Sequence, residues 1–212
     1  VDIATIESIC LNFARRIGLN VCEFFLEKVE LNGKLHSVLL LKRFDRIFDQ
    51  EKQILKKVPT LSALSLLNAT WLPRDSERWS YPLLAEAMLE MKMPIKDIHE
   101  LYKRMIFNAV VGNDDDHPKN HAFYFINQQW RLTPLFDVVT NTEYSPTRLA
   151  IRIGLQGEII NRDNLLSMCE YFKLSNHETQ QIIDEIYNLK DEIHQQINQV
   201  IDVCKDNGNS KN

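Results

Sequence analysis

Apolar residues recur at the spacing of amphipathic helices near the start of the chain and through most of its second half. Between residues 3 and 17 they stand three or four positions apart, and Gly18 follows as a helix C-terminal glycine would. Ser80 is an expected N-cap, and Ser175 with Glu178 forms an expected capping box. The same spacing predicts further helices near residues 60–69, 80–91, 94–111, 163–173 and 177–204.

Shorter apolar stretches predict strands that pair in two hairpins. The strands are expected at residues 21–31, 35–42, 121–126 and 130–133. The first two flank Asn32-Gly33, which is the strongest short signal for a hairpin turn. A further strand is expected at 147–153. Together with the helices, these strands predict an α+β fold.

The composition is that of a soluble globular protein, and it narrows the classes of function. The 212 residues are 44% hydrophobic and 25% charged, which is ordinary for a folded domain. The net charge of -4 gives no basic footprint, so we expect no direct contact with nucleic acid. The four cysteines form no CxxC pair, which is typical of reduced thiols in a cytoplasm. No apolar run approaches the roughly twenty residues that span a bilayer, so we expect no membrane segment.

The motif with the most chemical content follows the predicted helix at 94–111. Asp115 stands five residues before Asn120, and Asp137 lies beyond the second predicted hairpin. Kinases place a catalytic base and two magnesium ligands in this order along the chain. Phosphoryl transfer depends on positioning and charge neutralisation, for which a base, an amide oxygen and a second carboxylate suffice. The order therefore predicts a phosphotransferase that uses ATP and Mg²⁺.

The same loop allows other interpretations, which the spacing disfavours. Asp114 and Asp116 compete with Asp115 for the role of base, but only Asp115 has the kinase spacing to Asn120. Taken alone, a stretch rich in Gly, Asn and Asp is also typical of a polar turn after a helix. A calcium loop is disfavoured because the Gly at its sixth position and the Glu at its twelfth are absent.

Three stretches of the chain occur in the order found in a known kinase family. They are Arg15–Val21, Lys42–Arg46, and Asp115–Asn120 joined with Arg131–Val138. In these stretches the chain resembles the HipA-type serine/threonine kinase toxins of bacterial toxin-antitoxin systems, over roughly residues 1–140. The resemblance implies a protein-kinase-like α+β fold, with a mostly helical C-lobe, a hinge and a remnant of the smaller lobe.

The resemblance assigns roles in the catalytic loop and in the segment after the second hairpin. It implies that Asp115 is the catalytic base and that His117 and Lys119 belong to the same loop. Lys119 would neutralise phosphate charge. Asn120 and Asp137 are the implied ligands of Mg²⁺.

The resemblance also assigns a nucleotide site near the start of the chain. Lys42, Arg43 and Phe44 resemble the hinge between the lobes, where backbone groups meet adenine, although the family often has Glu in place of Lys42. Glu7 stands where a helix-borne acid would pair with the phosphate-binding lysine of the smaller lobe. The alternative for Glu7 is an ordinary exposed helix glutamate.

The six glycines of the chain form no Gly-rich phosphate loop. In the family this loop and the phosphate-binding lysine lie before the point where this chain begins, so we expect that region to be absent here and to be needed for full activity. Residues 1–42 are then expected to be the remnant of the N-lobe up to the hinge, and residues 43–205 the C-lobe. The catalytic loop is expected at 112–120 and the metal-binding segment at 133–138. Residues 206–212 are expected to form a disordered tail.

One polar loop remains outside this scheme. Trp71 and Trp79 flank residues 73–78, which include two arginines. Because Trp and Arg are enriched at binding hot spots, this loop is a candidate contact for a protein substrate. Ordinary partial burial of Trp is the more common situation.

The resemblance implies a bacterial cytoplasmic serine/threonine kinase toxin that transfers the ATP γ-phosphate to a protein hydroxyl. It further implies an aminoacyl-tRNA synthetase as target, a DNA-binding HipB-like antitoxin, and in some systems a small HipS-like third protein related to the missing N-terminal segment. An alternative is a catalytically incomplete kinase, or pseudokinase, that acts as a protein-binding module. A small-molecule kinase is a third interpretation, since the catalytic loop does not identify the acceptor.

Overall fold

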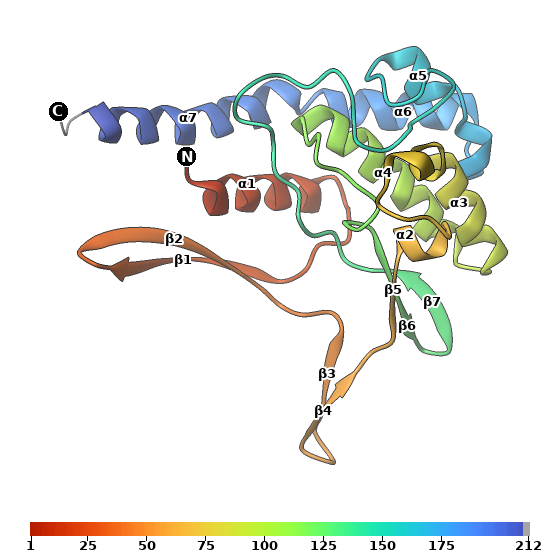
Figure 1. Cartoon of the computed structure of the whole chain (residues 1–212), viewed down its shortest axis with the longest axis horizontal. Coiled ribbons are helices and arrows are strands. Elements are labelled where there is room, and N and C mark those ends of the chain that lie inside the picture. Colours follow the sequence, from red (N-terminus) through yellow and green to blue (C-terminus); the bar gives the residue numbers. More distant parts are fainter. Residues whose placement is uncertain (210–212) are drawn as a thin grey trace.

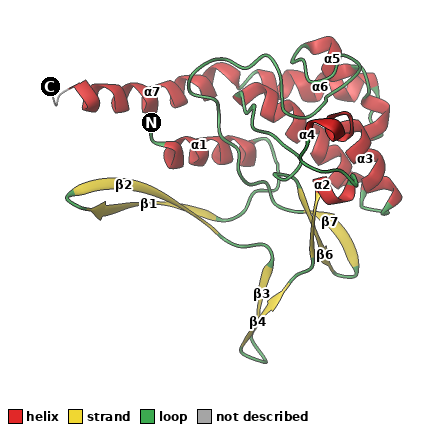
Figure 2. Cartoon of the chain, viewed as in Figure 1, coloured by secondary structure: helices red, strands yellow, loops and turns green. Residues whose placement is uncertain are grey.

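The computed structural model describes residues 1–209 and combines a helical part with three small sheets (Figure 1). Figure 2 shows the helices gathered in one part of the molecule, with hairpins extending from it. No helix within residues 1–209 has the length and hydrophobicity to cross a membrane. The α-helices are α1 (Ile3–Arg16), α2 (Ala63–Leu66), α3 (Tyr81–Glu90), α4 (Ile95–Val111), α5 (Arg162–Leu166), α6 (Asn176–Tyr187) and α7 (Lys190–Asn209). The strands are β1 (Phe24–Leu31), β2 (Lys34–Leu41), β3 (Arg46–Asp49), β4 (Ile54–Lys57), β5 (Thr60–Ser62), β6 (Ala122–Ile126) and β7 (Gln129–Leu132).

The first helix and the first hairpin form where the sequence predicts them. Asp2 caps α1 by accepting a hydrogen bond from the Thr5 backbone N–H at 3.1 Å. Strands β1 and β2 pair antiparallel around Asn32 and Gly33, whose φ angles of 54° and 71° are the left-handed values that a two-residue hairpin turn requires. One face of the hairpin contacts α1, where the Thr5 hydroxyl lies 3.2 Å from the Ser37 hydroxyl.

Two strand regions differ from the prediction. Strands β3 and β4 form a hairpin that the apolar pattern did not indicate, because the strands are short, exposed and separated by a charged turn in which Asp49 accepts two backbone N–H groups. The helix expected at 60–69 is wrong for its first residues. Thr60–Ser62 is strand β5, which pairs with β6, and the helix α2 begins only after the Ser62 cap.

The helical part packs around α4, and α1 shares the same core. Buried apolar side chains from α1 (Phe13), α4 (Met105), β6 (Phe123) and α6 (Ile183) belong to one continuous cluster. The N-terminal helix and the helical part are therefore packed as one unit.

Four predictions for the C-terminal half need correction. The helix expected at 163–173 is divided into the short helix α5 and a separate 3-10 helix at Cys169–Phe172. The single helix expected at 177–204 is two helices, α6 and α7, which are separated at Asn188 and Leu189 and both contact α4. Residues 147–153 form isolated bridges, including Ser80 with Arg152, in place of a strand. Helix α7 continues to Asn209, past Asp206 where the disordered tail was expected, and residues 210–212 lie outside the described residues. The capping box of Ser175 and Glu178 is confirmed.

Candidate active site

The loop after α4 closes tightly on itself and presents Asp115 to solvent. Gly112 ends α4 with φ 71°, and a Cβ atom at this position would lie 3.3 Å from Pro146 Cδ. The Asp115 carbonyl oxygen accepts hydrogen bonds from the His117 N–H (2.8 Å) and from Asn120 Nδ2 (3.1 Å). The Asp115 side chain is 86% exposed. The loop therefore holds its backbone fixed while the carboxylate stays accessible to a reactant.

The neighbouring carboxylate, Asp116, is buried in a polar network that the sequence did not reveal. Its side chain is 1% exposed, and it accepts hydrogen bonds from the Tyr81 hydroxyl and from His121 Nε2, the latter at 2.7 Å. Asn108 Nδ2 donates to the Tyr81 hydroxyl at 3.1 Å. Burial, and then the charge of Asp116, raises the pKa of Tyr81 well above its usual value, so Tyr81 stays a donor. The buried Asp116 side chain therefore stabilises the loop through these hydrogen bonds and is not accessible to a substrate.

Asp137 lies beyond β7, at the same end of the β6–β7 hairpin as Asn120. The hairpin pairs Phe123 with Leu132, so the residues before β6 and after β7 are brought together. The Asp137 N–H donates to Glu7 Oε1 at 3.2 Å, and the Asp137 backbone has a φ of 57°. Burial raises the pKa of Glu7, and the charge of Asp137 raises it further. The predicted helix acid thus contacts the predicted metal ligand segment directly.

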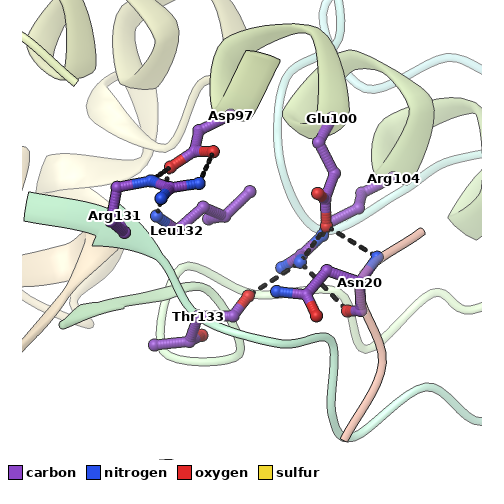
Figure 3. A network of polar contacts seen from close by, with 7 residues as sticks. All are labelled: Asn20, Asp97, Glu100, Arg104, Arg131, Leu132 and Thr133. Carbon is purple, nitrogen blue, oxygen red and sulfur yellow. Dashed lines mark hydrogen bonds and ion pairs between the residues drawn. The ribbon is translucent and has the colours of Figure 1, made fainter. Parts of the chain in front are cut away.

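Charged side chains attach this segment to α4 (Figure 3). Arg131 of β7 donates to both oxygens of Asp97, at 2.6 and 2.8 Å, and the Leu132 N–H donates to the same carboxylate at 3.0 Å. Arg104 pairs with Glu100 and also donates to the Thr133 carbonyl oxygen at 2.7 Å. Helix α4 therefore fixes both the catalytic loop that follows it and the strand that leads to Asp137.

The hinge-like residues line a cavity of about 390 Å³ that lies between the chain linking β2 to β3 and the paired strands β5 and β6. Its walls include Lys42, Arg43 and Phe44, together with Ala122 and Phe136, and the rings of Phe44 and Phe136 lie 5.6 Å apart. A mostly apolar cavity of this size, with two aromatic rings in its wall, has room for a planar base such as adenine. Phe136 immediately precedes Asp137, so the cavity adjoins the predicted metal ligand.

The lysine and arginine of the hinge-like stretch are engaged with neighbouring acids. Lys42 Nζ pairs with Glu23 Oε2 at 2.8 Å, and Arg43 pairs with Asp45 at 2.7 Å. Both cations are largely exposed, so these pairs add little stability, and the predicted adenine contact at the hinge would need only backbone groups. A larger cavity of about 650 Å³ between α4 and α6 contains none of the predicted site residues.

The oxygen atoms of Asn120 and Asp137 fit a hard cation. Asn120 uses its Nδ2 to bond the Asp115 carbonyl, which leaves its amide oxygen as an acceptor, and the Asp137 side chain is exposed. Within residues 1–209, no group of three or more His, Cys, Asp or Glu side chains could hold a metal ion by itself.

The predicted residues therefore fall into three neighbouring groups. One loop carries Asp115, His117, Lys119 and Asn120. Glu7 and Asp137 are in contact, and the hinge-like stretch lines the adjoining cavity. Sequence reasoning missed the buried supports Tyr81 and His121. Tyr81 lies 35 residues before Asp116, and nothing in the sequence shows that the His121 ring turns back to the Asp116 carboxylate.

Comparison with solved structures shows the kinase-like fold. The HipA of Shewanella oneidensis, solved as a toxin–antitoxin complex with HipB and operator DNA, matches with a TM-score of 0.73 and 18% identity, over 92% of this chain and 49% of that chain. The Helicobacter pylori proinflammatory kinase CtkA matches with a TM-score of 0.58 and 14% identity, over 92% of this chain and 84% of that chain. These likenesses confirm the predicted α+β, kinase-like fold.

Relatives in sequence point to the same family. A protein of Sinorhizobium fredii named "Putative kinase Y4mE" is 26% identical over 166 residues, which cover 74% of this chain and 37% of that protein. A second, "Putative kinase Y4dM", is 23% identical over 145 residues, which cover 63% of this chain and 33% of that protein. The chain thus spans about a third of the length of these relatives. Residues 1–194 match the model of the HipA-like C-terminal domain, and the chain belongs to that family.

Proposed function

We propose that this chain is the nucleotide- and magnesium-binding core of a serine/threonine protein kinase of a bacterial toxin–antitoxin system. The observation that carries the proposal is an exposed Asp115 on a loop that orients Asn120, together with a cavity lined by Phe136, the residue before Asp137. Family membership and the kinase-like fold support the same reaction class.

In this proposal the chain's own residues position the reactants. Asp115 accepts the proton of the acceptor hydroxyl, because its carboxylate is exposed while its backbone is held by His117 and Asn120. The amide oxygen of Asn120 and the carboxylate of Asp137 hold Mg²⁺, which neutralises phosphate charge when bound. Lys119, exposed on the same loop, meets the transferred phosphate.

Full activity is proposed to need a Gly-rich segment and its phosphate-binding lysine, supplied from outside these 212 residues. Glu7 is proposed to pair with that lysine. Its carboxylate accepts a hydrogen bond from the Asp137 N–H, which places it beside the proposed metal ligand, where the phosphates would be bound. If no such segment joins the chain, the second candidate applies, in which the chain is a binding module without phosphoryl transfer.

The proposed partners follow from the family and from the solved relative. The Shewanella oneidensis HipA was solved with HipB and operator DNA, so we propose a DNA-binding HipB-like antitoxin as the partner of this protein. An aminoacyl-tRNA synthetase as protein substrate, a small HipS-like third protein, and a place in the bacterial cytoplasm are proposed from the family resemblance.

A labelling experiment tests the enzyme against the binding module. The purified protein is incubated with γ-labelled ATP, Mg²⁺ and a bacterial lysate, with Asp115→Asn as the inactive comparison and Asp163→Asn, an exposed acid on α5, as the matched control. Label on serine or threonine of a protein that depends on Asp115, and that is retained with Asp163→Asn, supports the kinase. Nucleotide binding without any Asp115-dependent labelling, even when a Gly-rich segment is added, supports the binding module.

A further inference from the structure

The loop between α2 and α3 covers one side of the catalytic loop. Trp71 in this loop meets His117 edge to face, with ring centroids 5.1 Å apart and planes at 68°. The ammonium nitrogen of Lys119 lies 5.3 Å from the centre of the Trp71 ring. The two residues that contact the indole stand two and four positions after Asp115. Trp71 is therefore a direct neighbour of the proposed catalytic residues.

The indole is held in place by its own loop. Trp79 stacks on Trp71 with centroids 4.1 Å apart and planes at 23°, and Trp79 Nε1 donates to the Thr70 carbonyl oxygen at 3.1 Å. Asp75 accepts the Thr70 N–H at 2.7 Å, and Arg78 donates to the Asn68 carbonyl oxygen at 2.6 Å. These bonds close the loop on both sides of Trp71. The ring is 39% exposed and still fixed in orientation.

The same part of the chain also holds the catalytic loop through its backbone. The Leu64 N–H donates to the Pro118 carbonyl oxygen at 3.3 Å, and the Ala63 N–H donates to the His121 carbonyl oxygen at 2.8 Å. Lys119 itself is exposed, and a free lysine side chain samples many rotamers. A cation that rests on an indole face loses much of that freedom before any ligand arrives.

We propose that Trp71 is a positioning residue for Lys119 of the catalytic loop. Its ring holds the Lys119 ammonium and the His117 imidazole beside Asp115, so that Lys119 meets the terminal phosphate of MgATP without a search of rotamers. The inference rests on the proposed function and deepens it, because it assigns a role to the polar loop at residues 70–79. No covalent step is involved.

The test uses the whole chain labelled with 5-fluorotryptophan, whose three tryptophans give separate fluorine resonances that are assigned with Trp71→Phe, Trp79→Phe and Trp130→Phe. Without nucleotide, Lys119→Met moves the Trp71 resonance. The matched control Lys190→Met removes another lysine that lies over an aromatic ring, 6.0 Å from the centre of Tyr187, and leaves the Trp71 resonance in place. Addition of MgATP to the wild type then shifts the Trp71 resonance and leaves the resonance of Trp130, on β7, unchanged. In Lys119→Met, MgATP shifts the Trp71 resonance only slightly.

Calorimetric titration of MgATP on the same samples separates this inference from the proposed function. Trp71→Leu weakens MgATP binding roughly fivefold, while Trp71→Phe keeps most of the affinity because phenylalanine also presents a ring face. Binding of MgATP with an unmoved Trp71 resonance, and with Trp71→Leu equal to wild type, overturns the inference alone. No binding of MgATP at all contradicts the proposed function and the inference with it. Thermal unfolding of Trp71→Leu and Trp71→Phe verifies that both variants are folded.

Discussion

Two adjacent aspartates show how the surroundings of a residue decide its role. Asp115 is almost fully exposed, whereas Asp116 is buried against Tyr81 and His121. The spacing to Asn120 selected Asp115 as the candidate base, and the exposed side chain of Asp115 leaves that prediction open to test. The function of Asp116 as a buried support depends on Tyr81 of α3 and on His121, which lies just before β6, and no sequence pattern shows that these side chains meet Asp116.

Removal of the Tyr81 hydroxyl tests this buried support. Tyr81→Phe removes one of the two donors to the buried Asp116 carboxylate, which keeps His121, and leaves Asn108 Nδ2 without its acceptor. We therefore expect a loss of about 1–3 kcal/mol in the free energy of unfolding. Urea unfolding measures the change. Tyr144→Phe is the matched control, because Tyr144 also donates to an aspartate of the loop, Asp114, but is exposed; we expect a change within about 0.5 kcal/mol. Equal losses of unfolding free energy in both variants would contradict the claim that the Tyr81 hydrogen bond stabilises the fold because it is buried.

Glu7 makes the stability of the fold depend on pH in a defined direction. Burial and the charge of Asp137 raise its folded pKa above the ordinary value of 4.5. A raised folded pKa means that the folded state favours the protonated form of Glu7. This contribution to stability is complete at a pH below the pKa of Glu7 in the unfolded chain, and it is lost as the pH rises through the pKa of Glu7 in the folded protein. Because glutamine stays neutral, Glu7→Gln should gain stability relative to wild type between pH 4.5 and neutrality. Urea unfolding at several pH values checks this, and a relative stability that falls over that range would refute it.

At the scale of elements, the sequence predicted those whose signals are local. The Asn32-Gly33 turn, the helix ending at Gly112 and the capping box at Ser175 all lie where their motifs indicate. The errors arise where tertiary contacts decide. Thr60–Ser62 is a strand because β6 offers it a partner, and the last two helices separate so that both pack on α4.

The ion pair of Asp97 and Arg131 is the element-scale contact that joins α4 to β7. Arg131→Met leaves Asp97, whose side chain is only 5% exposed, without its guanidinium partner, so we expect a loss of about 3 kcal/mol in the free energy of unfolding. Arg148→Met is the control, since it breaks a surface pair with Glu158 and should cost less than about 1 kcal/mol. Urea unfolding compares the two, and a small effect of Arg131→Met would show that β7 is held by other contacts.

For the whole molecule, the site depends on segments that are far apart in the sequence. Helix α1 supplies Glu7 to the backbone of Asp137, and the hinge-like residues meet Phe136 across the cavity. Periodicity and turn signals could not predict these contacts, because they join residues separated by most of the chain. The order of the three family-like stretches predicted the kinase-like arrangement, which the comparisons bear out at the level of family and fold, but not these contacts themselves.

The most direct test of the central claim is calorimetric titration of MgATP into the protein. We expect wild type to bind MgATP, and Asp137→Ala to bind it at least roughly tenfold more weakly because a metal ligand is lost. Asp163→Ala, an exposed acid on α5, is the control and should bind like wild type. Binding that is strong and equal in all three proteins, or that does not require Mg²⁺, would contradict the assignment of Asp137 and the nucleotide site built around it.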